Sequence, residues 1–452
     1  MGGQPDRTVV GGRRWLVTSV DRDEVCDAYI PRHGNPGYAV QHYDLALDYR
    51  VASNRLSGRA QVTLRTDREL TRLSLDLARL RVTKVVADTC RVSRFTTRGD
   101  KLHVSFDGSL AAGSQLVLDI AYNGSPKPLD GVCGDVGWEE LSDGVIVAGQ
   151  PDGAPSWFPC NDLPSEKAGY RISVTTESPY TVIANGRLVE RRVGASRTSW
   201  VYEQPEPMAT YLATVQIGRY DHRSHRAVVP LHTVGPPRLR RAVTHDLGRQ
   251  PQMLVAFQDM FGPYPFAGYT VVVTDDDLEI PLEAQSLSVF GANHVDGRRG
   301  AERLVAHELA HQWFGNSVTV GQWRDIWLHE GFACYAEWLW SERADGRPAD
   351  GFARAAWERL AALPQDLLLA DPGPDLMFDD RLYKRGALTL HALRLSIGDE
   401  RFFGLLQSWA TTHRHGTVST ETFLAHAERW SDASVVQELR RWLTSRPLPA
   451  LP

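Results

Sequence analysis

The chain lacks the features that mark several classes of protein. No apolar run approaches the length of about 18 residues that a membrane-spanning helix requires. Its 50 basic and 55 acidic residues are interspersed, without a basic block, and the net charge is −5. This balance argues against nucleic acid or an anionic membrane as the main partner. Internal repeats and low-complexity tracts are also missing, so we expect a soluble globular protein.

Cysteine is scarce, and its placement excludes two further classes. The number is odd, no CxxC pair occurs, and the residues are scattered: Cys26, Cys90, Cys133, Cys160 and Cys334. This pattern fits reduced thiols better than a disulfide framework or a cysteine-type zinc site. The first 20 residues also lack the apolar core and small-residue cleavage site of a signal peptide. Both observations favour a cytoplasmic protein.

The first half of the chain has the pattern of β-strands. Between residues 37 and 220, short segments alternate apolar and polar residues and are separated by Gly, Asp or Asn. In "YAVQHYDLALDYRV", Tyr43, Leu45, Leu47 and Tyr49 share one face at a period of two. Many short strands in series predict an antiparallel sheet or sandwich.

From about residue 240 the period becomes helical. One helix is expected over 240–262, ending at Gly262 before Pro263, and others over 300–315 and 325–343. A strand is expected from residue 269, and further helices follow the Pro- and Asp-rich loop at 364–380. The predicted fold class is therefore α+β with two domains: an arm at 1–30, a β-rich domain at 31–220 and a mostly α domain at 221–452.

The stretch "VAHELAHQWFG" carries the strongest chemical signal. His307 and His311 are four residues apart, so a helix directs both imidazoles to one side, where they can bind one metal ion. A catalytic zinc site needs a third protein ligand, and Glu330 follows His311 after 18 intervening residues on the next predicted helix. Imidazole and carboxylate donors with an open position suit Zn²⁺. The alternative is two histidines on the surface of an amphipathic helix.

Glu308 lies about 100° around the helix from His307. There it can reach a water that zinc activates without binding the metal itself. A carboxylate in this position accepts the proton of the water and passes it to a leaving amine, which is the chemistry of HExxH zinc peptidases.

The chain resembles the M1 family of zinc aminopeptidases, which includes aminopeptidase N and leukotriene A4 hydrolase. The resemblance covers roughly residues 30–430 and rests on several segments: "FPCND" (158–162), "YLATVQIGRYD" (211–221), "FGPYPF" (261–266), "HELAHQWFGN" (307–316), "WLHEGFACYAE" (327–337) and "LYKRGALTLHALR" (382–394). It implies a saddle-like N-terminal β domain followed by a thermolysin-like catalytic domain.

The resemblance also assigns roles to residues. It implies one Zn²⁺ per chain on His307, His311 and Glu330, with Glu308 as general base. Tyr383 would donate a hydrogen bond to the developing oxyanion, although a tyrosine that merely packs a helix is the alternative. Glu337, two turns after Glu330, would orient a zinc-binding imidazole, or else is a solvated helix carboxylate.

An aminopeptidase must also bind the α-ammonium group of its substrate. In the M1 family a GxMEN motif supplies the main glutamate, and here the matching text is "IPLEA", with Glu283 in that position, 24 residues before His307. Glu279 is a competing candidate that fits the spacing less well. Gln150 matches a second family acceptor, or is an ordinary loop glutamine. The acidic turn at 275–277 is more simply a solvated turn.

The sequence departs from the family pattern in several places. The motif glycine and asparagine are replaced by Ile280 and Ala284, His329 replaces the usual asparagine before the third ligand, and Lys384 follows Tyr383 where an acidic residue is common. The chain ends at Pro452, so we expect a short form lacking the helical C-terminal domain of larger members.

The leading hypothesis is therefore a zinc aminopeptidase that acts on peptides with a free N-terminus. An endopeptidase or a specialised hydrolase on the same metal site is the alternative, motivated by the altered motif. A non-catalytic scaffold is a third hypothesis, weakened because all the ligands are present. The sequence leaves the preferred N-terminal residue and the oligomeric state open.

Overall fold

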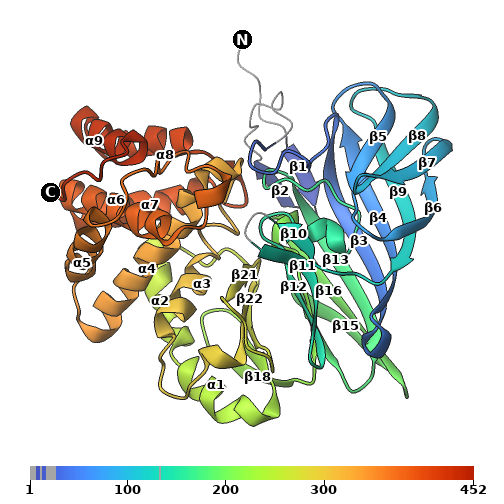
Figure 1. Cartoon of the computed structure of the whole chain (residues 1–452), viewed down its shortest axis with the longest axis horizontal. Helices are drawn as coiled ribbons and strands as arrows, with labels where there is room; N and C mark the ends of the chain where they lie inside the picture. The colour runs from blue at the N-terminus through green and yellow to red at the C-terminus, as the bar shows by residue number, and fades with distance from the viewer. Residues whose placement is uncertain (1–6, 11–12, 17–26, 132–133) are drawn as a thin grey trace.

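The computed structural model describes residues 7–10, 13–16, 27–131 and 134–452. Figure 1 shows a strand-rich half on one side of the molecule and a helical half on the other, in the order the sequence predicts. Much of the predicted arm, residues 1–30, lies outside the described residues. Its described part includes a hairpin of β1 (Arg7–Val10) and β2 (Arg13–Leu16).

The largest sheet of the β-rich half has seven strands in the order β15-β16-β13-β3-β4-β9-β6. They are β3 (Tyr38–Arg50), β4 (Arg55–Thr66), β6 (Arg81–Ala87), β9 (Gln115–Gly124), β13 (Lys167–Glu177), β15 (Arg187–Val193) and β16 (Arg197–Ala209). Neighbours are antiparallel except β13, which runs parallel to β3. This exception to the antiparallel prediction arises because these two strands are joined by a long connection rather than a hairpin.

Two smaller antiparallel sheets complete this half. One has the order β10-β11-β12-β17-β14, and the other has the order β5-β8-β7. Their strands are β5 (Leu70–Asp76), β7 (Val92–Arg98), β8 (Lys101–Leu110), β10 (Leu129–Gly131), β11 (Gly134–Leu141), β12 (Gly144–Ala148), β14 (Thr181–Ala184) and β17 (Val215–Gly218).

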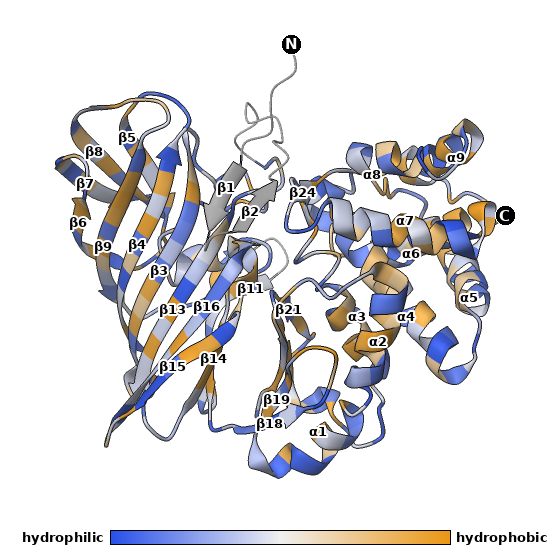
Figure 2. Cartoon of the chain, turned by 180° about the vertical axis from the view of Figure 1, so that it is seen from behind, coloured by the Kyte–Doolittle hydropathy of each residue, from blue (hydrophilic) through white to orange (hydrophobic). Residues whose placement is uncertain are grey.

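The period of two in the sequence produces the buried face of β3. Tyr43, Leu45, Leu47 and Tyr49 are all buried, as predicted, because successive side chains of a strand point to opposite faces. Figure 2 shows hydrophobic and hydrophilic residues alternating along β3 and β4. The core of this half is therefore built by alternation rather than by continuous apolar runs.

The second half begins with a mixed sheet in the order β18-β19-β20-β22-β21. Its strands are β18 (Asp221–His225), β19 (Leu231–Gly235), β20 (Tyr269–Val273), β21 (Leu282–Ala284) and β22 (Leu287–Phe290). The edge strand β21 pairs antiparallel with β22. A separate short pair, β23 (Thr319–Val320) and β24 (Thr417–Val418), ties the segment after the HExxH motif to the C-terminal region.

The helices follow the predicted order with one difference. They are α1 (Arg240–Asp246), α2 (Gln250–Phe261), α3 (Glu302–Ala310), α4 (Trp327–Asp345), α5 (Ala349–Ala361), α6 (Asp380–Ile397), α7 (Asp399–Thr412), α8 (Thr420–Ala427) and α9 (Ala433–Thr444). The single helix expected over 240–262 is divided, because Gly248 interrupts it and Pro251 suits only the first turn of a new helix. Among the described helices, none has both the length and the apolar composition needed to cross a membrane.

Helix α4 lies at the centre of the helical half. Its residues from Trp327 to Trp340 are all buried, and it packs against α3 and α6. The approach to α6 is very close, since a Cβ added to Gly331 would lie 2.8 Å from the Cα of Gly386. Only glycine at both positions allows these backbones to touch. This contact brings the helix that carries Glu330 against the helix that carries Tyr383.

Candidate active site

The two histidines of the motif lie side by side at the end of α3. His307 belongs to the helix, and His311 follows its last residue, Ala310, while keeping helical dihedral angles of −55° and −25°. Their ring centroids are 4.7 Å apart, and both side chains are buried. The four-residue spacing therefore places two imidazoles together, as helix geometry requires.

Glu330 comes to these histidines from the first turn of α4. Its Oε2 lies 3.3 Å from Nε2 of His307 and 3.5 Å from Nε2 of His311. Ligand atoms of the three residues all lie within 4.8 Å of one another. Two imidazole nitrogens and a carboxylate oxygen are the donors of a catalytic zinc site with an open position.

The other ring nitrogens have partners of their own. Nδ1 of His307 lies 2.9 Å from Oε1 of Glu337, and Nδ1 of His311 lies 3.1 Å from the carbonyl oxygen of Phe314. Acceptors at these positions favour a proton on Nδ1 and leave the lone pair of Nε2 free for a metal. Glu337 is itself held by Arg303, whose Nη1 is 3.2 Å from its Oε2.

The electrostatics of the group fit a bound cation. Burial disfavours the charged imidazoles, but Glu330 and Glu337 raise the pKa of His307 to about 10, and Glu330 and Glu283 raise that of His311 to about 9. The carboxylates therefore stabilise positive charge at these nitrogens. A zinc ion supplies that charge in place of the protons, so the donor set fits the metal.

Glu308 faces the same group from α3. Ligand atoms of Glu308, His311 and Glu283 lie within 4.8 Å of one another. Burial raises the pKa of Glu308, and its Oε2 has no hydrogen-bond partner within the described residues. An unpaired buried carboxylate oxygen is rare in folded proteins and typical of a site that receives a substrate, water or ion.

Tyr383 reaches the group from the first turn of α6. Its ring stacks near that of His307, with centroids 6.0 Å apart and planes inclined by 18°. Burial, together with the carboxylates of Glu330 and Glu283, raises the pKa of Tyr383 well above its ordinary value. The phenol therefore keeps its proton at neutral pH and can act as a hydrogen-bond donor.

Glu283 lies on β21, and burial and the neighbouring Glu330 raise its pKa. Glu279, the competing candidate, belongs to neither close group of ligand atoms within the described part of the chain.

Gln150 is connected to the site indirectly, through a neighbouring residue. The preceding residue, Gly149, packs on the backbone of Tyr211. Burial raises the pKa of Tyr211, and the carboxylates of Glu283 and Glu330 raise it further, so Tyr211 links Gln150 to the site. Nε2 of Gln150 is buried without a hydrogen-bond partner among the described residues.

Several contacts around the site were not anticipated from the sequence. His329 is buried, and its Nε2 accepts a hydrogen bond from the backbone N–H of Val320 at 2.8 Å. Lys384 donates to Sγ of Cys334 at 3.2 Å, one helical turn beyond Glu330 on α4. Gln312 and Asn316, both within "HELAHQWFGN", contact the strand of Glu283. The sequence signal that could have singled out Gln312 and Asn316 was their position inside this family-like segment.

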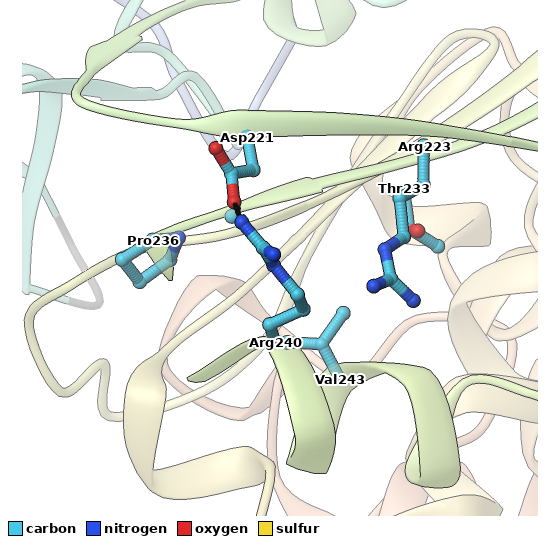
Figure 3. Close-up of a pocket in the computed structure, with 7 residues that line it drawn as sticks. Asp221, Arg223, Thr233, Pro236, Arg240 and Val243 are labelled. Carbon is cyan, nitrogen blue, oxygen red and sulfur yellow. Dashed lines mark hydrogen bonds and ion pairs between the residues drawn. The ribbon is translucent and has the colours of Figure 1, made fainter. Parts of the chain in front are cut away.

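A second feature, shown in Figure 3, is a pocket between the β18–β19 hairpin and α1. It is lined by Asp221, Arg223, Thr233, Gly235, Pro236, Arg240 and Val243. Asp221 is neutralised by an ion pair with Arg240 across the pocket. The pocket shares no residue with the histidine and carboxylate group, so it is not the candidate active site.

Comparison with known proteins identifies the family. The model of the peptidase M1 N-terminal domain matches residues 39–212, and that of the peptidase family M1 domain matches residues 246–442. An M1 zinc metallopeptidase from Deinococcus radiodurans has a crystal structure that superposes with a TM-score of 0.87. It is 32% identical, and the match covers 94% of this chain and 98% of that one. The chain belongs to peptidase family M1.

More distant M1 relatives are considerably longer than the matched region. Probable aminopeptidase 2 of Sulfurisphaera tokodaii is 23% identical over 91% of this chain and 54% of its own length. Aminopeptidase M1-A of Oryza sativa subsp. japonica is 27% identical over 68% of this chain and 37% of its own length. The chain therefore spans about half, or less, of the length of these curated M1 relatives.

The M1 fold agrees with the sequence-based prediction in class and order. A β-rich N-terminal part precedes a mixed, mostly helical part that carries the HExxH helix. Membership of this family implies one catalytic Zn²⁺, and the buried donor set suits that metal.

Proposed function

We propose that this M1 chain is a zinc aminopeptidase that removes the N-terminal residue from peptides. The observation that carries the proposal is the position of Glu283. Its carboxylate lies within 4.8 Å of ligand atoms of Glu308 and His311. An anionic acceptor beside a hydrolytic metal site suits a substrate whose ammonium group is one residue from the scissile bond.

His307, His311 and Glu330 would hold the metal, and Glu337 would orient His307 through Nδ1. When bound, zinc polarises the substrate carbonyl and lowers the pKa of a water to about 7. Glu308 accepts the proton of the attacking water and then gives it to the leaving amine. The unpartnered Oε2 of Glu308 is available for this transfer.

The remaining residues orient the substrate. Glu283 accepts hydrogen bonds from the α-ammonium group, with Gln150 as a second acceptor. Tyr383 donates to the oxygen that becomes negative as the carbonyl carbon turns tetrahedral. A mutant of the relative from Deinococcus radiodurans has been crystallised with a Tyr-Ser-Ala substrate, and a mutant two-domain M1 zinc metallopeptidase has been crystallised with L-tryptophan and with L-arginine. These free-amine ligands support peptides with an unblocked N-terminus as the substrate class.

We also propose a division into a β-rich domain at 31–220 and a catalytic domain at 221–452. Asp221 supports this boundary because it opens β18 and the mixed sheet of the second half. A cytoplasmic location is proposed from the cysteines, since Cys90, Cys160 and Cys334 are free.

The test is hydrolysis of a panel of aminoacyl fluorogenic amides beside matched N-acetylated amides. We expect cleavage of the free-amine set alone, its loss on treatment with a chelator and its return when zinc is added. Cleavage of the acetylated set would favour an endopeptidase or a specialised hydrolase. Absence of all cleavage by the zinc-loaded protein would favour a scaffold.

A further inference from the structure

The carboxylate of Glu283 is placed by a short hairpin. Glu283 is the central residue of β21, and a two-residue turn, Gln285 and Ser286, leads into β22. Ser286 has a φ of +61°, which residues with a side chain seldom adopt without support from their surroundings. The support comes from hydrogen bonds on both sides of the turn.

The first set of hydrogen bonds comes from Gln312, the residue after His311. Its Nε2 donates to the carbonyl oxygens of Ala284 at 3.1 Å and Leu287 at 3.4 Å. Its Oε1 accepts the backbone N–H of Ser286 at 2.8 Å. One buried side chain therefore bonds the end of β21, the turn and the start of β22.

Asn316 adds a fourth bond from the same segment. Its Nδ2 donates to the carbonyl oxygen of Ala284 at 2.9 Å, so this oxygen accepts from both amides. Ala284 stands where the family motif has asparagine, and it contributes its backbone alone. The hairpin is thus fixed to the metal-binding segment without a polar side chain at position 284.

The β-rich half holds the same turn from the other side. Asn185 donates to the carbonyl oxygen of Gln285 at 3.0 Å, and Ser286 donates through Oγ to Gln204 at 2.8 Å. The turn is thus restrained on both sides. Among the residues whose side chains hold it, Gln312 is the one next to a proposed metal ligand, His311. The amide of Gln312 therefore links the hairpin of Glu283 directly to the segment that carries His311.

We propose that Gln312 is a positioning residue for recognition of the substrate amine, assisted by Asn316. It touches neither substrate nor metal, and it acts by fixing β21 so that Glu283 meets the α-ammonium group. This inference rests on the proposed aminopeptidase function. It implies that loss of the Gln312 amide weakens binding of free-amine ligands while leaving the water-activating group intact.

The experiment compares Gln312→Met with Gln250→Met. Both replace a fully buried glutamine by an apolar side chain of similar length. Gln250 lies at the start of α2, and its side-chain amide has no hydrogen-bond partner in the described structure. Kinetics on one free-amine amide should show KM raised about tenfold in Gln312→Met, with kcat and zinc content retained. Gln250→Met should keep the wild-type KM.

A double-mutant cycle with Glu283→Gln separates positioning from general damage. If Gln312 acts through Glu283, adding Gln312→Met to Glu283→Gln should change KM by less than about twofold. Additive effects, loss of zinc, or a fall in kcat at unchanged KM would overturn the inference. A lower kcat at unchanged KM is the result expected of a partly unfolded population, because only the number of active molecules falls and substrate binding is unaffected.

Asn316→Leu provides a milder variant that removes a single donor to Ala284. We expect its KM to rise about threefold, and an unchanged KM would contradict the inference even if Gln312→Met fails to fold. L-arginine and N-acetyl-L-arginine serve as direct binding probes. Wild-type protein that neither cleaves free-amine substrates nor binds L-arginine defeats the proposed function itself, whereas normal wild-type behaviour with unchanged variants defeats only the role of Gln312.

Discussion

At the scale of single residues, Glu308 combines burial with an oxygen that has no partner among the described residues. This carboxylate is the proposed carrier of the proton between water and leaving amine. Glu308→Ala should keep the metal, because the three ligands are unchanged, but lose turnover by a factor of about 10²–10⁴. Zinc analysis and kcat on an aminoacyl amide test this. Activity within about tenfold of wild type would rule out Glu308 as the base.

Tyr383 offers a more limited change. Phenylalanine preserves the ring that stacks near His307 and removes only the hydroxyl donor. We expect Tyr383→Phe to lower kcat by about 10²–10³, the usual effect of losing one donor to an oxyanion, with little change in thermal stability. Steady-state kinetics and a melting curve measure both, and a kcat close to that of wild type would assign the tyrosine to packing.

His415 illustrates how a residue away from the metal donors affects stability. Burial, with Lys167 and Arg414 nearby, lowers its pKa to about 2 in the folded protein. The unfolded chain binds this proton near pH 6.5, so the contribution of His415 to the free energy of unfolding is fully present above that pH. This contribution falls by about 1.4 kcal/mol for each pH unit below 6.5.

His415→Asn should remove this dependence, because asparagine does not titrate and tolerates the φ of +61° at this position. The difference in unfolding free energy between pH 7.5 and 5.5 should shrink by about 1.4 kcal/mol relative to wild type. Urea denaturation at the two pH values measures it. An unchanged difference would mean that the folded state accepts the proton.

At the scale of elements, the contact of α4 with α6 depends on two glycines. A Cβ added to Gly386 would lie 2.6 Å from the Cα of Gly331, so Gly386→Ala must push the helices apart. We expect a loss of about 1–3 kcal/mol in stability and a lower kcat, since these helices carry Glu330 and Tyr383. Thermal unfolding and kinetics test this prediction.

Gly351, within α5, is the matched control for that substitution. An added Cβ there meets no atom within 4 Å. Gly351→Ala should therefore stabilise the protein by about 0.5–1 kcal/mol, because alanine favours the helix and no neighbour is displaced. A similar loss of stability in both variants would show that the contact between α4 and α6 is not the cause.

The elements themselves were largely predictable, because each is encoded by a local pattern. Alternation predicted the strands around Tyr43 and Leu47, and the helical period predicted α3 and α4. The division between α1 and α2 and the parallel pairing of β13 with β3 were missed. Gly248 and Pro251 were only weak signals of the division between α1 and α2. The pairing of β13 with β3 could not be read locally, because strand order depends on contacts between distant segments.

At the scale of the whole molecule, Lys167 links the two halves. It opens β13, and its Nζ donates to the carbonyl oxygens of Asn316 and Ser317 at 3.0 and 2.9 Å, and to Oγ1 of Thr319 at 2.9 Å. Lys167→Met removes this donor from all three acceptors and should cost about 1–3 kcal/mol of stability. Lys84→Met, at an exposed position, should change stability by less than about 0.5 kcal/mol.

The same scale limits what the sequence can predict about the site. The HExxH spacing and the distance to Glu330 indicated the metal donors, because helix geometry is local. The sequence matched Glu283 to a family motif but contained no sign of what holds it. Gln312, Asn185 and Gln204 reach its hairpin from distant segments, and only the folded chain brings them together.

The hairpin of Glu283 has a consequence for dissecting the protein. A fragment beginning at Asp221 would retain each proposed zinc ligand, together with Gln312 and Asn316. It would lose Asn185 and Gln204, which hold the outer side of the turn, and the Nζ donor of Lys167. The two halves are therefore not interchangeable modules, since the hairpin that carries Glu283 in one half is held partly by amides of the other. Swapping the β-rich half between M1 relatives should alter which peptide ends are accepted, even when the hydrolytic residues are identical.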